Sequence, residues 1–271
     1  MRDFRLAKAT KPSHLSTNAE QRLLLLSKIN RILSSIGVRK HFIDAEWAST
    51  DPMPSDLQPI LEEQRNVTLV ATISVRRSDA ERRVNEFVRI VQSYTNLQPC
   101  LVPGNPAYLS QHELCKNPIR LIEAYARAIR RVYDGTMYLG CENIERASAR
   151  IAGLFNMTLF HVYRRSMLEA FLSLPSEGGT AIYTPVVVDA INDMVKSYVA
   201  RRGMVNDPGD CLPKHVIDEY VLSLSDEGFR VLDYLRRRRA LLVVQPFTDS
   251  TLAIRKIFIK IRRLANEEGV T

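Results

Sequence analysis

Two carboxylates, Asp44 and Glu46, follow a short apolar run and are the first residues that could do acid–base chemistry. A carboxyl group can act as a general acid or base near neutral pH when burial raises its pKa. The run before them, residues 41–43, is short and mostly apolar, which predicts a strand with the two acids at its carboxyl end. The alternative is that both acids lie in a solvated loop.

A second candidate site is the turn that begins at Gly140. The stretch from Met137 to Phe155 starts with a short apolar run, breaks at Gly140 and continues with apolar residues at helical spacing, which predicts strand, turn and helix. Backbone N–H groups at the start of such a helix can bind a phosphate. Glu142 and Glu145 oppose this, because acidic side chains themselves interact favourably with that helix end. Both interpretations stay open.

Serine, arginine and histidine residues elsewhere in the chain are further candidates for chemistry. Ser74 ends an apolar run, and Arg76 and Arg77 after it could pair with the phosphate tail of a cofactor, although surface arginines are the commoner explanation. His161 lies between apolar residues and is expected in the core or at its rim. No spacing of histidines and cysteines indicates a metal site.

The elements that must position these residues alternate between strand and helix patterns. Almost none of the strand candidates shows the two-residue polar alternation of a half-exposed sheet, which predicts a parallel (β/α)8 barrel of the TIM type, formed by residues 1–271 as one domain. Strands are expected over residues 2–7, 41–43, 67–74, 97–102, 137–139, 157–162, 181–188 and 240–244. Helices are expected over residues 18–36, 56–64, 79–92, 119–133, 166–174, 189–201, 214–222, 226–238 and 250–265, besides the one that ends near Phe155.

Composition narrows the class of protein. Hydrophobic residues make up 45% and charged residues 25%, which favours a folded chain with a sizeable core. The net charge of +8 favours an anionic partner, either nucleic acid or a phosphorylated small molecule. The run Arg236–Arg239 favours a solvated helix end, although it could form a nucleic-acid patch with Arg262 and Arg263. Basic and aromatic residues do not interleave as in specific RNA-binding segments.

The cysteines and the apolar runs bear on location. The four cysteines have no CxxC spacing, and the chain is too large to need disulfides, so a reducing cytoplasm fits best. No apolar run has the length of a membrane helix, and the first residues carry no apolar signal segment. We therefore expect a cytoplasmic protein with no membrane partner.

Several segments together resemble a known enzyme family. They are residues 32–53, 66–77, 96–106, 137–155, 212–235 and 240–258. These segments resemble the luciferase-like oxidoreductases, the barrel family that includes the methylenetetrahydromethanopterin reductases and other deazaflavin-dependent enzymes. The chain departs from the family at Glu46, where typical members carry histidine, and at Pro103 and Asn105 beside Gly104, in a turn that is usually rich in glycine. Glu142 and Asn143 replace an uncharged residue and a glycine.

The resemblance implies a redox enzyme of archaeal type in which the cofactor lies across the carboxyl ends of the strands. The cofactor would be the deazaflavin coenzyme F420 or FMN, passing hydride to or from a small-molecule substrate. Glu46 would handle the proton. The residues expected to bind the cofactor are Asp44, Ser74, Gly104, Asn105, Gly140, Cys141 and Asn143.

The lost glycines favour a second hypothesis from a different class. In it, the chain is a degenerate, non-catalytic barrel that serves as a binding or assembly subunit, with nucleic acid as one partner. Among partners we expect a small-molecule substrate and homo-oligomers first, and nucleic acid less.

Overall fold

The computed structural model describes residues 5–10, 12, 15, 18–44, 51–75, 78–102, 118–141, 153–161, 180–187, 222–223, 240–245 and 251–267. Among these residues strands and helices alternate from β1 to β5, and the strands β5 to β9 then follow one another before α10. The strands are β1 (Leu6–Thr10), β2 (Lys40–Asp44), β3 (Thr68–Ser74), β4 (Leu97–Val102), β5 (Tyr138–Cys141), β6 (Met157–His161), β7 (Thr180–Val187), β8 (Leu222–Ser223) and β9 (Leu241–Gln245). The helices are α1 (Ala19–Ser35), the short 3-10 helix η2 (Pro54–Leu57), α2 (Gln58–Glu63), α3 (Ala80–Ile90), α4 (Pro118–Arg130) and α10 (Thr251–Glu267).

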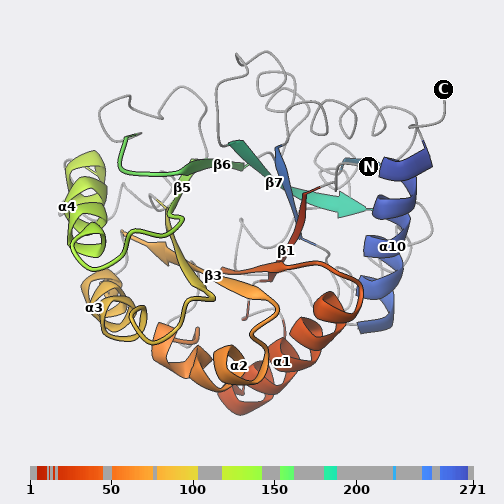
Figure 1. Ribbon diagram of the computed structural model, residues 1–271, viewed down its shortest axis with the longest axis horizontal. Coiled ribbons are helices and arrows are strands. Elements are labelled where there is room, and N and C mark those ends of the chain that lie inside the picture. Colours follow the sequence, from red (N-terminus) through yellow and green to blue (C-terminus); the bar gives the residue numbers. More distant parts are fainter. Residues whose placement is uncertain are drawn as a thin grey trace, which may run out of the picture.

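The strands form one parallel sheet that curls round a central axis, with helices on its outside (Figure 1). Its order is β6-β5-β4-β3-β2-β1-β9-β7-β8, and β6 pairs in addition with β7. Thus β1, near the start of the chain, pairs with β9, near its end, in the register Leu6 to Leu242. The predicted α/β class with a parallel sheet is confirmed.

Two apolar clusters fill the space on either side of the sheet. The outer cluster joins the strands to the helices and includes Leu69, Ile73, Phe87 and Phe258. The inner cluster contains only strand residues: Ala7, Ala9, Phe42, Val70, Cys100, Val102, Tyr138, Met157, Leu159, Leu241 and Val243. Because successive side chains of a strand point to opposite faces, membership of these clusters tells which residues face the inside of the curl. The strands are apolar on both faces, which explains the missing polar alternation in their sequences.

The two ends of α1 are capped by local chemistry. Asn18 accepts a hydrogen bond from the backbone N–H of Gln21 at 3.1 Å, so it satisfies one of the donors that a helix start leaves open. At the other end, Gly37 has φ 70°, which lets the chain turn out of the helix. The guanidinium of Arg262 in α10 donates to the carbonyls of Ile36 and Gly37, the latter at 2.7 Å. The expected helix and its end at Gly37 are confirmed.

Most expected elements are present with small shifts, and three expectations need correction. The first strand is β1 at Leu6–Thr10 rather than residues 2–7, because Lys8 and Thr10 are buried in it despite their polarity. Asp56 is not the helix cap: it accepts a hydrogen bond from the N–H of Met53 at 2.7 Å, so the helical segment begins earlier, as η2. Leu222 belongs to β8 rather than a helix.

The structure also bears on a strand that a proline interrupts, and it leaves several predicted helices untested. The strand over 97–102 is confirmed although Pro99 lies within it. Its pairing with β5 is limited to Cys100 and Leu101, which follow that proline. The helices expected at 166–174, 189–201 and 226–238 lie outside the described residues.

Candidate functional site

The inside of the curled sheet is polar at the carboxyl ends of its strands. Thr72 and Ser74 lie two and four residues after Val70, so they share its inward face, and their exposed fractions are 5% and 2%. By the same alternation, the buried Gln245 follows Leu241 and Val243. Two hydroxyls and an amide therefore line the carboxyl end of the interior, next to the apolar inner cluster. In parallel α/β proteins this end is where ligands usually bind.

The structure places four of the predicted site residues at strand ends. Asp44 ends β2 and pairs with Thr72, and Ser74 ends β3 and pairs with Val102. Gly140 pairs with Leu159 of the inner cluster, whereas Cys141 pairs with Phe160 of the outer cluster. Parallel strands of one sheet bring Asp44, Ser74 and Gly140 to the same end of the sheet. The expected turn at Gly140 is wrong, because β5 continues through Gly140 and Cys141, which pair with β6. Glu46, Gly104, Asn105 and Asn143 lie outside the described residues, as do Arg76 and Arg77.

The opposite end of the interior is closed by a polar network. Lys40 donates to Gln98 Oε1 at 2.9 Å and to the hydroxyl of Tyr138 at 2.6 Å. The ring of Phe42 meets that of Tyr138 edge to face at 5.2 Å between centroids. Burial and the charge of Arg5 lower the pKa of the Lys40 amine to about 8, and burial raises the pKa of Tyr138. These side chains occupy the amino end of the interior.

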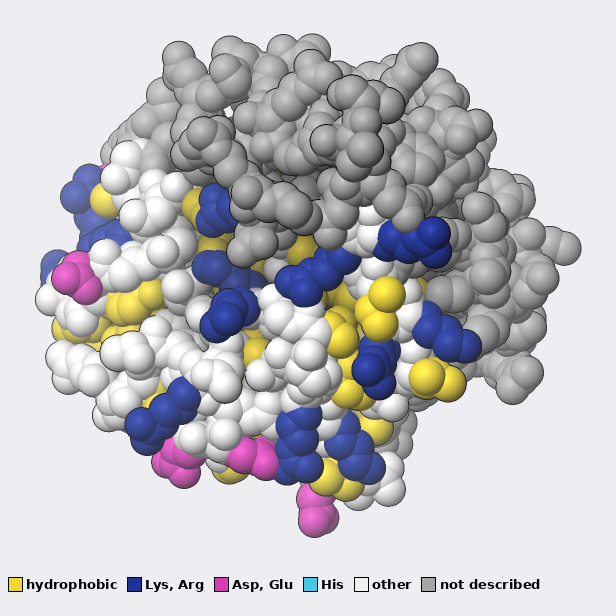
Figure 2. All heavy atoms as spheres, turned by 45° about the vertical axis from the view of Figure 1, so that its right-hand side comes forward, with side chains coloured by type: hydrophobic (Ala, Val, Ile, Leu, Met, Phe, Trp, Pro, Cys, Tyr) yellow, Lys and Arg dark blue, Asp and Glu magenta, His cyan; other side chains and the backbone are white. Residues whose placement is uncertain are grey.

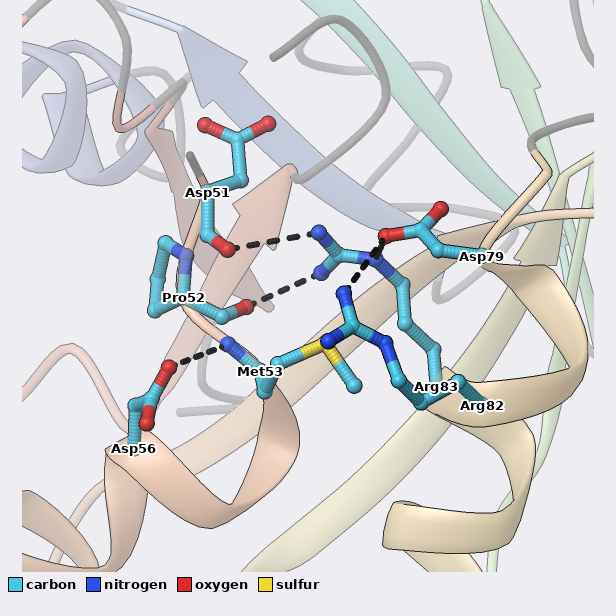
Figure 3. Close-up of polar contacts among 7 residues, drawn as sticks. All are labelled: Asp51, Pro52, Met53, Asp56, Asp79, Arg82 and Arg83. Carbon is cyan, nitrogen blue, oxygen red and sulfur yellow. Dashed lines mark hydrogen bonds and ion pairs between the residues drawn. The ribbon is translucent and has the colours of Figure 1, made fainter. Parts of the chain in front are cut away.

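A buried arginine holds the segment after β2 against the helix after β3 (Figure 3). Arg83, which is 1% exposed, donates to the carbonyls of Pro52 at 3.0 Å and Asp51 at 3.2 Å. Its third contact is the carboxylate of Asp79 at 2.7 Å, four residues earlier on the chain. A planar guanidinium has several donors in fixed directions, so it can hold three acceptors at once.

This contact, which we call the Arg83 anchor, holds the backbone at Asp51 and Pro52, seven and eight residues after the end of β2. In Figure 3 the Asp51 carbonyl faces Arg83 while its carboxylate points away from the guanidinium. That carboxylate is buried, since Asp51 is 4% exposed. The sequence prediction missed both residues. One signal was available: Arg83 lies on the same helical face as Ala80, Val84 and Phe87, all buried, and charged residues are rarely buried without partners.

A second buried polar group lies on the outer face of the sheet, away from the site. Lys8 donates to the carbonyl of Ala9 at 2.9 Å and to the hydroxyl of Thr10, and Thr10 Oγ1 lies 2.8 Å from His41 Nε2. Lys8 alternates with Ala7 and Ala9 of the inner cluster, so it faces the helices. Burial lowers the pKa of the Lys8 amine to about 7, and burial together with Lys8 lowers the pKa of His41. This group belongs to the packing of the fold.

Among the described residues, no group of three or more His, Cys, Asp or Glu side chains could hold a metal ion. None of the helices in the same part of the chain is long and apolar enough to cross a membrane.

Three solved structures have folds similar to that of this chain. No curated protein sequence matches the chain. The structure of apo-MsnO8 is 12% identical, with a TM-score of 0.63 over 97% of this chain and 98% of that one. The oxygenating constituent of 3,6-diketocamphane monooxygenase from Pseudomonas putida, a type II Baeyer-Villiger monooxygenase in complex with FMN, is 12% identical with a TM-score of 0.60 over 98% of each chain.

A third similar structure binds a different ligand. It is an uncharacterised protein from Clostridium thermocellum that binds two copies of 5-methyl-5,6,7,8-tetrahydrofolic acid, and it is 11% identical with a TM-score of 0.54 over 97% of this chain and 94% of that one. Identities this low establish a shared fold and no shared chemistry. At the level of sequence, one family model matches residues 25–218. The chain therefore belongs to the family described as "Family of unknown function (DUF7388)".

Proposed function

We propose that the protein is a luciferase-like oxidoreductase that binds FMN or the deazaflavin coenzyme F420 at the carboxyl ends of its strands and exchanges hydride with a small-molecule substrate. The observation that carries the proposal is the polar carboxyl end of the interior, where Thr72, Ser74 and Gln245 are buried. The fold is also shared with a monooxygenase constituent that is in complex with FMN. We further propose that the curled sheet is a (β/α)8 barrel formed by residues 1–271 as one domain, which the pairing of β6 with β7 supports.

The residues present fit a flat cofactor with polar edges. The hydroxyls of Thr72 and Ser74 can donate to or accept from ring oxygens and nitrogens, and the amide of Gln245 can do both at once. Gly140 has no side chain, so a ring can approach the backbone of β5 closely. A bound flavin or deazaflavin would supply the hydride-accepting ring.

The other roles in this proposal belong to the loop after β2. Asp44 would contact the cofactor and Glu46 would move the proton that accompanies the hydride, a role that suits a carboxyl group shielded from water. The Arg83 anchor supports this assignment because it holds Asp51 and Pro52, which follow Glu46 closely in the sequence. Effects on rate follow from such anchoring, since small displacements of a catalytic group slow a reaction markedly.

The experiment is a titration of the purified protein with FMN and, separately, with F420, followed by absorbance and fluorescence. We expect saturable binding of one of them. Replacing Ser74 by Ala should then weaken it roughly 5- to 10-fold, the value of about one hydrogen bond. The matched control is Ser93→Ala, because Ser93 is exposed just before β4, whose first residues lie at the amino end.

Two outcomes would count against the proposal. Absence of binding by either cofactor would remove it and favour the degenerate, non-catalytic barrel that acts as a binding or assembly subunit. Binding that Ser74→Ala and Ser93→Ala leave equally unchanged would move the cofactor away from the carboxyl end of β3.

A further inference from the structure

Helices α1 and α10 lie side by side on the outside of the sheet and form one continuous face. Arg262 links them, because its guanidinium reaches the carbonyls of Ile36 and Gly37 at the end of α1. α1 follows β1 in the chain, and α10 follows β9. Because β1 and β9 are parallel neighbours in the sheet, the two helices run in the same direction. Arg262 therefore holds the two helices together. Other exposed side chains of the two helices can contact another molecule.

This α1–α10 face carries most of the exposed large apolar side chains. Among the described residues there are four such side chains, and three of them are Leu24 (55% exposed), Leu252 (62%) and Ile259 (48%). Leu252 and Ile259 are seven residues apart on α10, so they lie on one side of that helix. Single exposed apolar residues are ordinary, but a cluster on two adjacent helices indicates a contact surface.

Exposed basic side chains lie near these apolar residues, and one acid, Glu20, is exposed four residues before Leu24 on α1. On α10, Arg255, Lys256 and Arg263 are exposed, and on α1 Lys28 is exposed. Lys256 follows Leu252 by four residues, and Arg263 follows Ile259 by four, so apolar and basic positions repeat together every seven residues. Figure 2, in which the side of the molecule that bears α10 comes forward, shows Lys and Arg side chains mixed with hydrophobic ones there, while acidic ones lie toward its edges.

The chemistry of the face selects among the partners that could cover it. A second copy would bring the same basic residues against it, and like charges across an interface are unfavourable. Nucleic acid would use the charges but not the apolar positions, and the exposed, described positions of α1 and α10 hold no aromatic side chain on which a base could stack. A helix with apolar residues in one stripe and acids beside it would use both sets.

We propose that the α1–α10 face docks an acidic amphipathic helix of another protein. The apolar stripe of that helix packs on Leu24, Leu252 and Ile259, and its flanking acids pair with Lys28, Arg255 and Lys256. The seven-residue repeat of α10 sets the spacing of the partner's apolar residues, as in helices that pack side by side. This surface lies outside the sheet and is independent of the cofactor site.

The test measures binding of three labelled probes to the full chain by fluorescence anisotropy. The first probe is a synthetic helix of about three heptads with Leu at every seventh position and Glu on both sides of it. The second has Ser in place of each Leu, and the third is a single-stranded RNA of about 20 nucleotides. We expect the first probe to bind at least about 10-fold more tightly than the second, because loss of the apolar contacts removes most of the affinity.

Paired substitutions locate the binding. Leu252→Ser and Lys256→Glu, each at an exposed position, should weaken the first probe by about 10-fold or more. Val132→Ser and Arg131→Glu are the matched controls, since both residues are exposed just after α4, on the opposite side of the molecule from α10 (Figure 1). These controls should leave the affinity unchanged.

Three outcomes overturn the proposal. The first is that the Leu-containing probe shows no saturable binding up to concentrations of about 100 µM. The second is that the α10 substitutions and their controls change its affinity equally. The third is that the RNA binds more tightly than the peptide and responds to Lys256→Glu but not to Leu252→Ser, which would assign the face to nucleic acid. None of these outcomes depends on whether a cofactor binds.

Discussion

The folded chain disfavours the charged form of Lys8. Its amine is 1% exposed and has two neutral oxygens as acceptors, Ala9 O and Thr10 Oγ1. Burial lowers its pKa from 10.5 to about 7, so the folded chain prefers the neutral amine. Above pH 10.5 both folded and unfolded chains carry it neutral. As the pH falls from 10.5 to about 7 the unfolded chain binds a proton that the folded chain excludes, and stability is lost over that range.

Replacing Lys8 by Met should therefore stabilise the protein at pH 7. Met has a similar length without a charge, and replacing a buried charge by an apolar side chain typically raises the free energy of unfolding by roughly 1–4 kcal/mol. The gain should shrink as the pH rises from about 7 toward 10.5, because the unfolded chain then loses the proton that the folded chain excludes. Denaturation by urea at several pH values measures this.

The control is Lys28→Met, which removes one exposed lysine from the outer side of α1. It should shift stability by less than about 0.5 kcal/mol at every pH. A wild-type protein whose stability does not change between pH 7 and 10, with Lys8→Met less stable at both, would show that Lys8 is charged and well solvated in the fold.

The residues of the candidate site differ in how far apart along the sequence their contacts lie. Asp44 and Ser74 could be predicted because each ends its own strand, and parallel strands bring such ends together, with Gly140 one residue before the end of β5. The Arg83 anchor could not, because Arg83 meets Asp51 and Pro52 from 31 or 32 residues away. Nothing local in the loop sequence indicates which arginine will reach it.

At the scale of elements, the turn between α1 and β2 depends on one glycine. Gly37 has φ +70°, and a Cβ added there would lie 3.0 Å from Nη1 of Arg262. The left-handed backbone and the crowded guanidinium therefore both oppose a side chain.

Gly37→Ala should destabilise the protein by about 1–2 kcal/mol, measured as a shift of the urea midpoint. Gly153→Ala is the control, because a Cβ there would meet nothing within 4 Å. Equal effects of the two substitutions would mean that the turn relaxes easily and that Arg262 finds other acceptors.

The helices and strands could be predicted where the local sequence carries clear signals. A capping Asn18, a helical apolar pattern and Gly37 together define α1, and the β-branched run before Ser74 defines β3. The start of β1 was not predictable, because the burial of Lys8 and Thr10 contradicts their polarity. A strand as short as β8 forms only because β7 offers backbone partners, with Val186 paired to Leu222, and two residues carry no periodicity.

At the scale of the whole molecule, the end of the chain completes the sheet that its beginning starts. β9 lies between β1 and β7 and pairs with both, and α10 packs on the outer cluster through Ile254, Ile257 and Phe258. Without β9, the edges of β1 and β7 would expose unpaired backbone groups.

A chain that ends at residue 239 should therefore show no cooperative thermal unfolding by circular dichroism, whereas the full chain should show it. Adding a peptide of residues 240–271 to the shortened chain during refolding tests whether the missing strand and helix alone are responsible. If the shortened chain unfolded cooperatively near the midpoint of the full chain, residues 1–239 would form a separate domain, against the single domain proposed for residues 1–271.

The Arg83 anchor also couples two neighbouring parts of the fold. One guanidinium contacts the backbone at Asp51 and Pro52 and the carboxylate of Asp79 at the start of α3, so the segment before η2 and the first turn of α3 share one partner. A substitution that removes the guanidinium therefore releases both segments at once, and neither can shift without the other while it is present.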